Sequence, residues 1–587
     1  MINTLSRRRI INTRTSAGDW TLHEGGPLAI CALFVVLVIC GVPILQLVLA
    51  ATGSFSAGVE TTLKTFFSAQ ILTATSNTIS VALASTIIAA TIGISLTLIL
   101  MTVQLRARRL LAFVFILSLM ISPQISALAF KTLAGPASPL LKAFGLAPPP
   151  GTPNPMLGFG GIVLVMGLQH APLVAITLAA GLSRVPHSII EAALLDGAKP
   201  LAIFSRILLP LVRPHVASAL LLAFVAGVGN FGIPALLGLP VGYMTLPTLI
   251  FQKLASFGTN TIAEAALISM LIGIIASIGV IASARLLSRN NVRLQGGDRL
   301  AVFINAGRWR VWIEYGLWSF FILTIFIPMM SLLATSIVPA YGMLLRFDTL
   351  TLDQYVEVLW RQDITRRAFS NSMIYASFAA IILSIFCMLL AYVLDRRLTR
   401  IRSTILALVE MPYALPGVVV GIACILLFAR PIPIIGVSIY ATKWVILFAY
   451  CASFMAIALK PIFAAITSLD RDIEEAALLD GAGLRQRLLS IIMPLILPSL
   501  LAGALMVFLI AFNELTVSAL LWSAGTETIG VVLLNLEDAG LPTQAAAMAV
   551  VSTMVVAILM LVLEVVGDMF PENTLPWRQL SAAQRHK

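Results

Sequence analysis

Twelve apolar stretches, each long enough to cross a lipid bilayer, follow one another along this 587-residue sequence. A helix needs about 20 apolar residues to span the hydrocarbon core, where only helices and closed barrels satisfy all their backbone polar groups. Only 11% of the residues are charged, whereas soluble domains carry roughly a quarter. The sequence therefore predicts an all-α integral membrane protein, with spans near residues 27–50, 77–100, 110–130, 157–182, 215–237, 262–284, 311–337, 371–394, 403–428, 443–466, 499–521 and 545–567.

The string EAALLDGA occurs twice, at Glu191–Ala198 and at Glu475–Ala482, 284 residues apart. The same offset, without a gap, also pairs Pro210 with Pro494. A long ungapped match inside one chain indicates a duplicated unit. Each unit holds six expected spans, with the repeated string between the fourth and the fifth. Because six is an even number, we expect parallel repeats related by an axis along the membrane normal.

The duplication predicts two six-span domains joined by a linker that is basic and polar. The first apolar run is too long for a signal-peptide core and lacks a clear cleavage site, so we expect it to be retained as a span. The expected parts are an N-terminal tail (1–26), a first domain (27–284) with its repeated loop (184–214), a linker (285–310), a second domain (311–567) with its repeated loop (468–498), and a C-terminal tail (568–587).

The basic residues predict the orientation of the spans. The net charge is +12, and most of the 38 Lys and Arg residues lie in the tails, the linker, the repeated loops and the other loops on the same side. Such an excess marks the cytoplasmic side, so both termini and both repeated loops are expected there. A nucleic-acid partner is disfavoured because the basic residues are spread between apolar segments and form no single patch.

Each repeated loop is expected to fold as two short helices joined by a turn at the membrane surface. In the first loop Pro186 and Ser188 suit a helix start, and Gly197 permits a sharp turn. Pro200 opens a second helix, which Pro210 and Pro214 are expected to end. A helix that merely rests on lipid is the alternative. Such a helix would favour Lys, Arg and Trp over Glu-Ala-Ala, and it would not need the same turn glycine in both copies.

The loop pattern resembles the EAA loop of the inner-membrane permeases of binding-protein-dependent ABC importers. The pattern is Glu-Ala-Ala, three residues, Gly, nine residues, Ile, one residue and Leu-Pro. The second copy departs from it only by having Met493 where the family prefers Leu. The first copy matches at Glu191, Ala192, Ala193, Gly197, Ile207, Leu209 and Pro210, and the second at Glu475, Ala476, Ala477, Gly481, Ile491 and Pro494; Asp196 and Asp480 precede the two glycines.

The resemblance implies a type I importer permease fold and a set of partners. In that family the EAA loop is the helix that seats on a cytoplasmic ATPase subunit. This chain looks like two fused permeases, so it is expected to bind two ATPase copies and a periplasmic or lipid-anchored substrate-binding protein. The location implied is the bacterial inner membrane. ATP and Mg²⁺ would belong to the ATPase, because this sequence has no GxxxxGK[ST] phosphate loop.

The sequence predicts no enzyme site, metal site or bound cofactor. No Ser/His/Asp or metal-ligand grouping occurs in a plausible loop, and the five cysteines lie in apolar spans without a CxxC pair. The chain is therefore expected to form the transport pathway and to transmit movement from its partners, while the chemistry takes place in another chain.

Polar residues within expected spans are candidates for the substrate pathway, because they are costly at membrane depth. The candidates are Gln169, His170, Asn230, Asn513 and Glu514, and Asn230 pairs with Glu514 at the repeat offset. Hydrogen bonding between packed spans is the alternative; it stays open for Glu514 and is favoured for the other four, of which Asn230 and Asn513 are kept with Glu514 as expected pathway residues.

The substrate is indicated only by similarity of loop sequences. The stretches FGIPALLGLP (231–240), YMTLPTLIFQKL (243–254) and LTVSALLWSAGTETIGVVLLNLEDAG (515–540) are most similar to permeases of ferric-iron importers. Relatives for thiamine, aminoethylphosphonate and polyamines are the alternatives. An ion-coupled secondary transporter is a further alternative, but it would need a proton or sodium relay buried in the membrane, and the acids expected to be buried there are few (Glu410, Glu514 and Glu564).

Overall fold

The computed structural model describes residues 17–57, 59–183, 185–256, 261–289, 304–396, 398–399, 401–429, 431, 436, 438–566 and 576–581. Most of the predicted linker and of both predicted tails lies outside these residues. The described part is helical throughout, apart from turns, loops and one isolated bridge between Val103 and Ile304. This all-α architecture is the one that the long apolar stretches predict.

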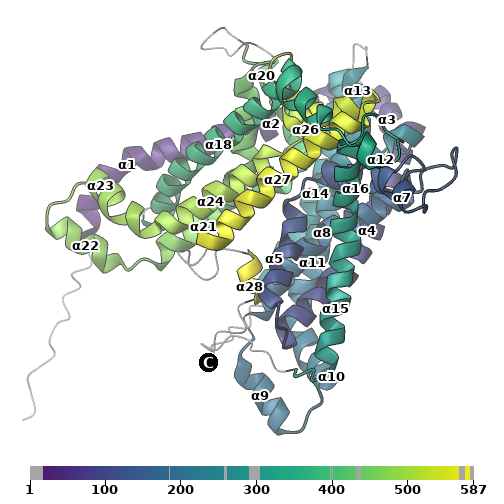
Figure 1. The fold of residues 1–587 in the computed structure, drawn as a ribbon. Helices are drawn as coiled ribbons and strands as arrows, with labels where there is room; N and C mark the ends of the chain where they lie inside the picture. Colours follow the sequence, from purple (N-terminus) through teal and green to yellow (C-terminus); the bar gives the residue numbers. More distant parts are fainter. Residues whose placement is uncertain are drawn as a thin grey trace, which may run out of the picture.

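The two halves contain corresponding series of helices (Figure 1). The first half has α1 (Ala17–Val36), α2 (Val42–Ala57), α3 (Val59–Phe66), α4 (Ala69–Thr102), α5 (Arg108–Met120), α6 (Pro123–Ala134), α7 (Pro139–Ala143), α8 (Phe159–Leu182), α9 (His187–Leu195), α10 (Pro200–Ile203), α11 (Leu209–Gly229), α12 (Gly232–Leu237), α13 (Leu246–Ala255) and α14 (Thr261–Arg289). The second half has α15 (Trp309–Phe321), α16 (Ile327–Ser336), α17 (Asp353–Val356), α18 (Asp363–Arg396), α19 (Arg402–Ala414), α20 (Gly417–Phe428), α21 (Lys443–Ser468), α22 (Arg471–Leu479), α23 (Leu484–Gln486), α24 (Met493–Phe512), α25 (Ser518–Leu521), α26 (Ile529–Asp538), α27 (Pro542–Val566) and α28 (Pro576–Ser581). Short π-helical turns occupy Leu37–Gly41, Phe204–Leu208, Ile322–Phe326, Glu357–Arg361 and Arg487–Ile492, and 3₁₀ turns occupy Leu239–Val241 and Phe347–Thr349.

Broken helices replace some of the expected straight spans. Among the described residues, ten helices are long and apolar enough to cross a membrane, and three further pairs of helices are sharply bent. The predicted third and ninth spans are two of these pairs, α5 with α6 and the helix after it (97°) and α19 with α20 (102°). The bends fall where Pro123 opens α6 and where Pro416 precedes α20, because proline cannot continue the hydrogen bonding of the preceding helix.

A further departure from the predicted spans concerns the fifth helix of the first half. Residues 215–237 were expected to form one span, but α11 ends at Gly229. The chain then continues as the third bent pair, Gly232–Val241 with Leu246–Ala255, at 73°. Among the described residues the number of candidate spans is thus ten, or up to thirteen if each bent pair counts as one span, so the predicted number of twelve is not confirmed.

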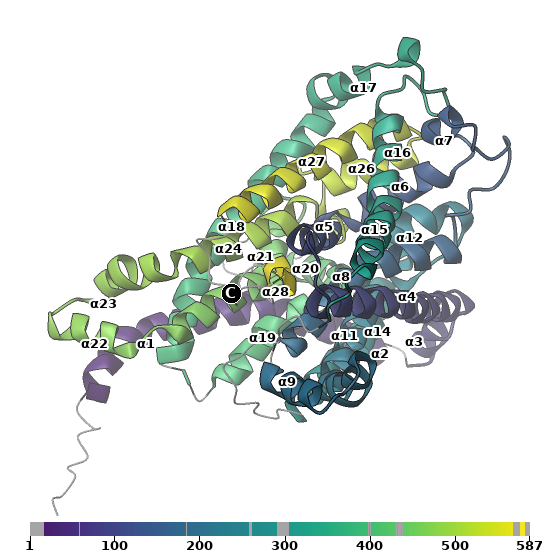
Figure 2. The ribbon, with the colours of Figure 1, turned by 60° about the horizontal axis from the view of Figure 1, so that its bottom comes forward.

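The molecule has two arms that diverge from a common apex (Figure 1). In the first arm α4, α8 and α11 pack together, with α9 at the tip; in the second arm α18, α21 and α24 pack together, with α22 at the tip. The apex holds α2, α12, α13, α20 and α26. Both views place α9 and α22 far apart, on separate arms (Figures 1 and 2).

The first span of each half crosses to the opposite arm. Helix α1 lies along α18 in the second arm, and α2 packs against α20. Helices α15 and α16 lie in the first arm, against α5 and α6 (Figures 1 and 2). Each arm therefore combines one duplicated core with a helix from the other half.

Candidate functional site

The two repeated loops have the same backbone conformation. Each begins with a nine-residue helix, α9 in the first loop and α22 in the second. Asp196 and Asp480 cap the ends of these helices, and each is followed by a glycine of positive φ, +79° at Gly197 and +80° at Gly481. Only glycine adopts this left-handed conformation without a steric cost, which explains why the turn glycine occurs in both copies.

Hydrogen bonds at the helix ends complete a Schellman motif in both loops. In the first loop the N–H of Ala198 donates to the carbonyl of Ala193 at 2.9 Å, and the N–H of Gly197 donates to that of Leu194 at 3.0 Å. The corresponding bonds in the second loop are also 2.9 and 3.0 Å long. Two bonds of this kind satisfy carbonyls that a helix otherwise leaves unpaired. They therefore stabilise the turn at the end of each loop helix.

The exposed face of each loop carries the predicted coupling residues. A leucine protrudes at the end of each helix, and Leu195 and Leu479 are both 89% exposed. Ala193 is half-buried and Ala477 is buried, so they face the rest of the protein. The other predicted loop residues lie on the exposed side in matching pairs: Glu191 and Glu475, Ala192 and Ala476, Asp196 and Asp480, Gly197 and Gly481, Pro210 and Pro494.

The prediction that Pro210 and Pro214 end the second helix of the loop is wrong, because both lie within α11. Helix α10 continues through the π-helical turn Phe204–Leu208 into α11, with Pro210 in the first turn of α11. The second loop does the same through Arg487–Ile492, with Pro494 in the first turn of α24. Proline has no N–H to donate to the preceding turn. The π-helical turn before it, with its i→i+5 hydrogen bonds, lets the helix continue through the proline.

A cavity of about 280 Å³ lies where the two halves meet, and breaks in four helical elements line it. The breaks separate α5 from α6, α11 from α12, α19 from α20 and α24 from α25. Non-helical backbone at membrane depth is tolerated where it lines a cavity or is buried in protein, and such breaks often mark binding sites. Asn230, Asn513 and Glu514, the predicted pathway residues, all line this cavity.

Two of these side chains cap the helices that follow the breaks. The Asn230 Oδ1 atom accepts a hydrogen bond from the N–H of Ile233 at 3.1 Å. In the second half the Glu514 carboxylate accepts from the N–H groups of Val517 (2.7 Å) and Ser518 (3.0 Å). Residues paired by the repeat offset thus have the same structural role, but only the second half places a carboxylate there.

Gln124 joins the two halves across the cavity. Its Nε2 atom donates to the backbone carbonyl of Asn513 at 2.8 Å, while the hydroxyl of Ser552 donates to the Asn513 side chain. Gln124 and Tyr413 also line the cavity, although neither was predicted from the sequence as a pathway residue. A polar residue directly after Pro123 in an apolar span was the available signal for Gln124.

Gln169 and His170 lie outside this cavity. Gln169 donates to the carbonyl of Ile121 at 2.8 Å and accepts from the hydroxyl of Ser126 at 3.0 Å, so it stabilises the break between α5 and α6. His170 is buried within α8. The hydrogen bonds of Gln169 agree with an interhelical role, and the burial of His170 agrees with a packing role.

The cavity is acidic. Glu514 is the only acidic residue among the described residues that line it, and none of these is Lys or Arg. Among the described residues there is also no group of three or more His, Cys, Asp or Glu side chains placed to hold a metal ion. The arrangement can therefore attract a cation by charge without offering a full coordination shell.

An ion pair joins the two halves near the apex. The Lys131 Nζ atom on α6 lies 2.5 Å from the Glu537 Oε2 atom on α26, and the Glu537 side chain is buried. Burial, with the nearby charge of Glu537, raises the pKa of Tyr341 to about 12. Burial also raises the pKa of Asp538, although Lys131 opposes this shift. The charges at this end of the molecule are thus held in a partly desolvated cluster.

The sequence matches a model of the family described as "Binding-protein-dependent transport system inner membrane component" twice, at residues 99–293 and 399–573. The two matches together cover more than half of the chain, and each includes one repeated loop. The chain belongs to this family. The predicted membership in the importer permeases is thus confirmed, and the double match confirms that this permease contains two copies of the domain.

Several curated relatives resemble this permease at modest identity. The ferric transport system permease protein FbpB of Actinobacillus pleuropneumoniae is 27% identical over 71% of this chain and 60% of the relative, so the permease spans about three fifths of that protein's length. The probable ABC transporter permease protein y4fN of Sinorhizobium fredii is 23% identical over 82% of this chain and 84% of the relative. The putative 2-aminoethylphosphonate transport system permease protein PhnU of Salmonella typhi is 27% identical over 40% of this chain and 82% of the relative.

Proposed function

We propose that this permease forms the complete membrane pore of an ABC importer, with two parallel six-span repeats of the type I fold. The domains are residues 27–284 and 311–567, and both termini face the cytoplasm of a bacterium whose inner membrane holds the protein. Two copies of a cytoplasmic ATPase, which carry ATP and Mg²⁺, bind the repeated loops. A periplasmic or lipid-anchored binding protein delivers the substrate at the apex. Family membership favours this role over that of an ion-coupled secondary transporter.

The observation that carries the proposal is the matched pair of loops at the tips of the arms. Each presents a leucine that is 89% exposed, beside an exposed glutamate and a turn glycine of positive φ. An apolar anchor surrounded by polar groups is typical of the centre of a protein interface. The residues assigned to ATPase coupling are Glu191, Ala192, Ala193, Asp196, Gly197, Pro210, Glu475, Ala476, Ala477, Asp480, Gly481 and Pro494.

The mechanism that this geometry supports is alternating access. The arms diverge between the loop tips and meet at the apex, as in a conformation open toward the ATPase side (Figure 1). ATP binding draws the two ATPase subunits together, which moves α9 and α22 toward each other. The arms then rotate and open the cavity toward the binding protein. Hydrolysis of ATP returns them to the divergent state.

Ferric iron is the substrate that we propose, with Asn230, Asn513 and Glu514 on its pathway. The acidic cavity supports a cation over an oxyanion, because a desolvated carboxylate repels phosphonate and attracts Fe³⁺ or a polyamine. The relative named for ferric transport supports iron among the cations. Aminoethylphosphonate, thiamine and polyamines remain the alternatives, and uptake assays with the reconstituted importer distinguish them.

Charged substitutions at the exposed leucines test the docking of the ATPase. We expect the double variant L195D/L479D to fold normally, because these side chains make few contacts in the permease, yet to lose co-purifying ATPase. Placing a carboxylate in an apolar pocket of the partner costs at least about 2 kcal/mol at each loop. The measurement is the ATPase-to-permease ratio after affinity purification of the permease.

The matched control is L146D. Leu146 is 71% exposed and follows shortly after α7, a helix that lies away from both loop tips (Figure 1). It should retain two ATPase copies per permease. A normal ATPase ratio for L195D/L479D would contradict the assignment of the loops.

A further inference from the structure

The two coupling helices, α9 and α22, are attached to the membrane helices by different chemistry. At the repeat offset, Ile190 of the first loop corresponds to Glu474 of the second, and Ile203 corresponds to Arg487. Ile190 and Ile203 are fully buried in the apolar core of the first arm. The first loop is thus held by apolar packing, while the second has a pair of opposite charges at the same two positions.

Glu474 connects α22 to α18 and to the chain that follows the loop. Its Oε2 atom lies 3.0 Å from the Nε atom of Arg396, and its Oε1 atom lies 3.3 Å from the Nη1 atom of Arg487. The hydroxyl of Tyr392 donates a further hydrogen bond to Oε1. The Glu474 side chain is 12% exposed and that of Arg487 only 2%. Charges this well buried interact strongly, and removing one of them leaves its partners uncompensated.

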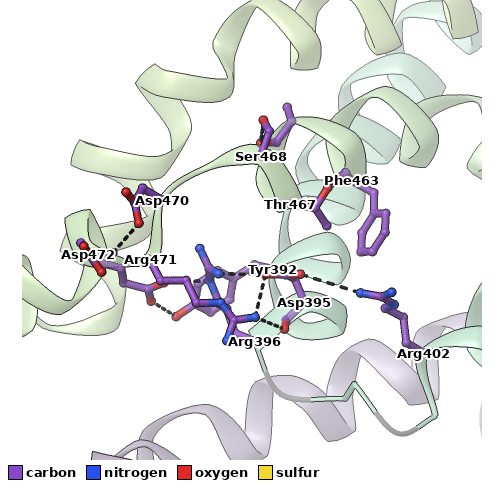
Figure 3. A network of polar contacts seen from close by, with 12 residues as sticks. Tyr392, Asp395, Arg396, Arg402, Phe463, Thr467, Ser468, Asp470, Arg471 and Asp472 are labelled. Atoms are coloured by element: carbon purple, nitrogen blue, oxygen red, sulfur yellow. Dashed lines mark hydrogen bonds and ion pairs between the residues drawn. The ribbon is translucent and has the colours of Figure 1, made fainter. Parts of the chain in front are cut away.

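Asp395 extends the network from α18 to α19 (Figure 3). Its carboxylate lies 2.9 Å from Arg396, 3.6 Å from Arg471 at the start of α22, and 3.9 Å from Arg402. Arg402 is the first residue of α19, and its guanidinium also lies over the ring of Phe463 on α21. The second coupling helix is therefore linked through charges to the first turn of α19.

The other end of α19 lines the central cavity. Pro412 and Tyr413 belong to its last turn, and both contribute to the cavity wall together with Glu514. A rigid helix of 13 residues thus separates the charge network from the cavity. If α22 moved and displaced Asp395 and Arg402, α19 would move with them and shift the wall of the cavity.

The corresponding helix of the first half is fixed differently. Helix α5 also begins with an arginine, but the Arg108 side chain donates to the carbonyl of Leu580 on the C-terminal helix α28, at 3.3 and 3.1 Å. The neighbouring Arg109 pairs with Glu564 at the end of α27. The start of α5 is therefore held by the second half of the chain and, among the described residues, shows no ion pair with α9.

We propose that Glu474 is a positioning residue that couples the second loop, and not the first, to the cavity through Arg396, Asp395 and Arg402. The two loops are then unequal: α22 transmits the movement of its ATPase subunit to α19, while α9 serves chiefly as an attachment point. This proposal rests on the proposed function, in which both loops bind ATPase subunits.

The test uses the full permease–ATPase complex and a reporter that does not depend on the substrate. Tyr413→Cys places a single accessible thiol at the cavity end of α19, in a background with Cys31 replaced, because the other native cysteines are buried. The rate at which a maleimide labels this thiol is compared with and without ATP. Met120→Cys, at the end of α5, is the corresponding reporter for the first half.

We expect E474Q to retain both ATPase copies and most ATP hydrolysis. The ATP-dependent change in labelling at Tyr413→Cys should fall at least about fivefold, because neutralising Glu474 removes its ion pairs with both Arg396 and Arg487, a loss large enough to weaken coupling by that factor. The change at Met120→Cys should persist. The control is R366Q, which removes an exposed ion pair with Asp363 at the far end of α18 and should leave both reporters unchanged.

A second variant separates transmission from simple attachment. E474I/R487I gives the second loop the apolar pair of the first loop, and Arg396 keeps Asp395 as its partner. The proposal predicts that this variant binds the ATPase but remains defective at Tyr413→Cys. Recovery of the full ATP-dependent change in E474I/R487I, or no loss of it in E474Q, would overturn the proposal while docking stays intact. Complete absence of ATPase from every variant, R366Q included, would overturn the proposed function and this inference together.

Discussion

Asn230 and Glu514 illustrate how the two halves diverge while their local structure is preserved. Both side chains accept a hydrogen bond from the backbone N–H three residues later, and both line the same cavity. The capping requirement explains why an oxygen-bearing side chain is found at each position. The negative charge at Glu514 is not needed for capping, so it is available for function.

Replacing Glu514 with asparagine should separate the capping role from the role of the charge. Asparagine caps helices well, so we expect E514N to unfold at nearly the same temperature as the natural protein. Uptake of ferric iron should fall about tenfold, equivalent to ~1.4 kcal/mol of lost attraction for a cation in the cavity. Thermal unfolding of the purified protein and uptake into proteoliposomes are the two measurements.

Alanine at the same position is the matched comparison. E514A removes the acceptor as well as the charge, so its unfolding free energy should fall by about 1 kcal/mol in addition to the loss of uptake. If E514N transported ferric iron at the natural rate, Glu514 would be a structural cap alone.

Helices α9 and α22 each end at a turn that requires one particular backbone conformation. Gly197 and Gly481 have positive φ, and a Cβ atom added at either would meet no atom within 4 Å. A substitution there is therefore penalised through backbone strain and not through collision. A sequence that repeats the glycine at both loops is consistent with this backbone requirement.

Valine and asparagine at the turn glycines should have different effects. The double variant G197V/G481V should strain each turn by about 1–2 kcal/mol, shift the exposed leucines and weaken ATPase docking. G197N/G481N should dock more nearly normally, because asparagine enters the left-handed region more readily. Co-purification of the ATPase measures both. Equal docking by the two variants would show that this turn does not position the docking surface.

At the scale of the whole molecule, the exchange of first spans makes the two halves interdependent. Helices α1 and α2 complete the second arm, and α15 and α16 complete the first. The arms meet at the apex, where the Lys131–Glu537 ion pair bridges the halves. Opening the cavity toward the apex would require this contact to separate.

Breaking the Lys131–Glu537 pair should favour the apex-open state. K131M leaves the buried Glu537 carboxylate without its cation, at a cost of about 2 kcal/mol after allowing for the partial exposure of Lys131. We expect ATP hydrolysis in the absence of the binding protein to rise at least about threefold. The charge-reversed double variant K131E/E537K should return hydrolysis toward the natural rate, and a failure of K131M to raise it would contradict this role of the ion pair.

Much of this architecture could be predicted from local sequence signals. Apolar length predicts helices, and the repeat of EAALLDGA predicts two equivalent loops whose turn glycines have positive φ. The helix breaks were only partly predictable, because proline at Pro123 or Pro416 permits either a kink or a complete break and tertiary packing decides between them.

Contacts between helices that are far apart in the chain cannot be read from any periodic pattern in the sequence. Nothing in residues 17–57 indicates that α1 lies along α18, because any apolar helix surface can pack against several partners. The network around Glu474 depends on residues from four separate segments, and its charges were visible in the sequence only as ordinary loop residues. Asn230, Asn513 and Glu514 were selected because each is polar within a long apolar stretch, but the cavity that they share depends on how the halves meet.

The distance between the two coupling helices tests the central claim most directly. Spin labels at L195C and L479C, in the reconstituted complex with Cys31 replaced, report the separation of the loop tips by pulsed electron paramagnetic resonance. The account predicts a shorter distance when ATP binds and a return to the longer distance after hydrolysis. A distance that stays the same through the ATP cycle, in a complex that still transports its substrate, would contradict it.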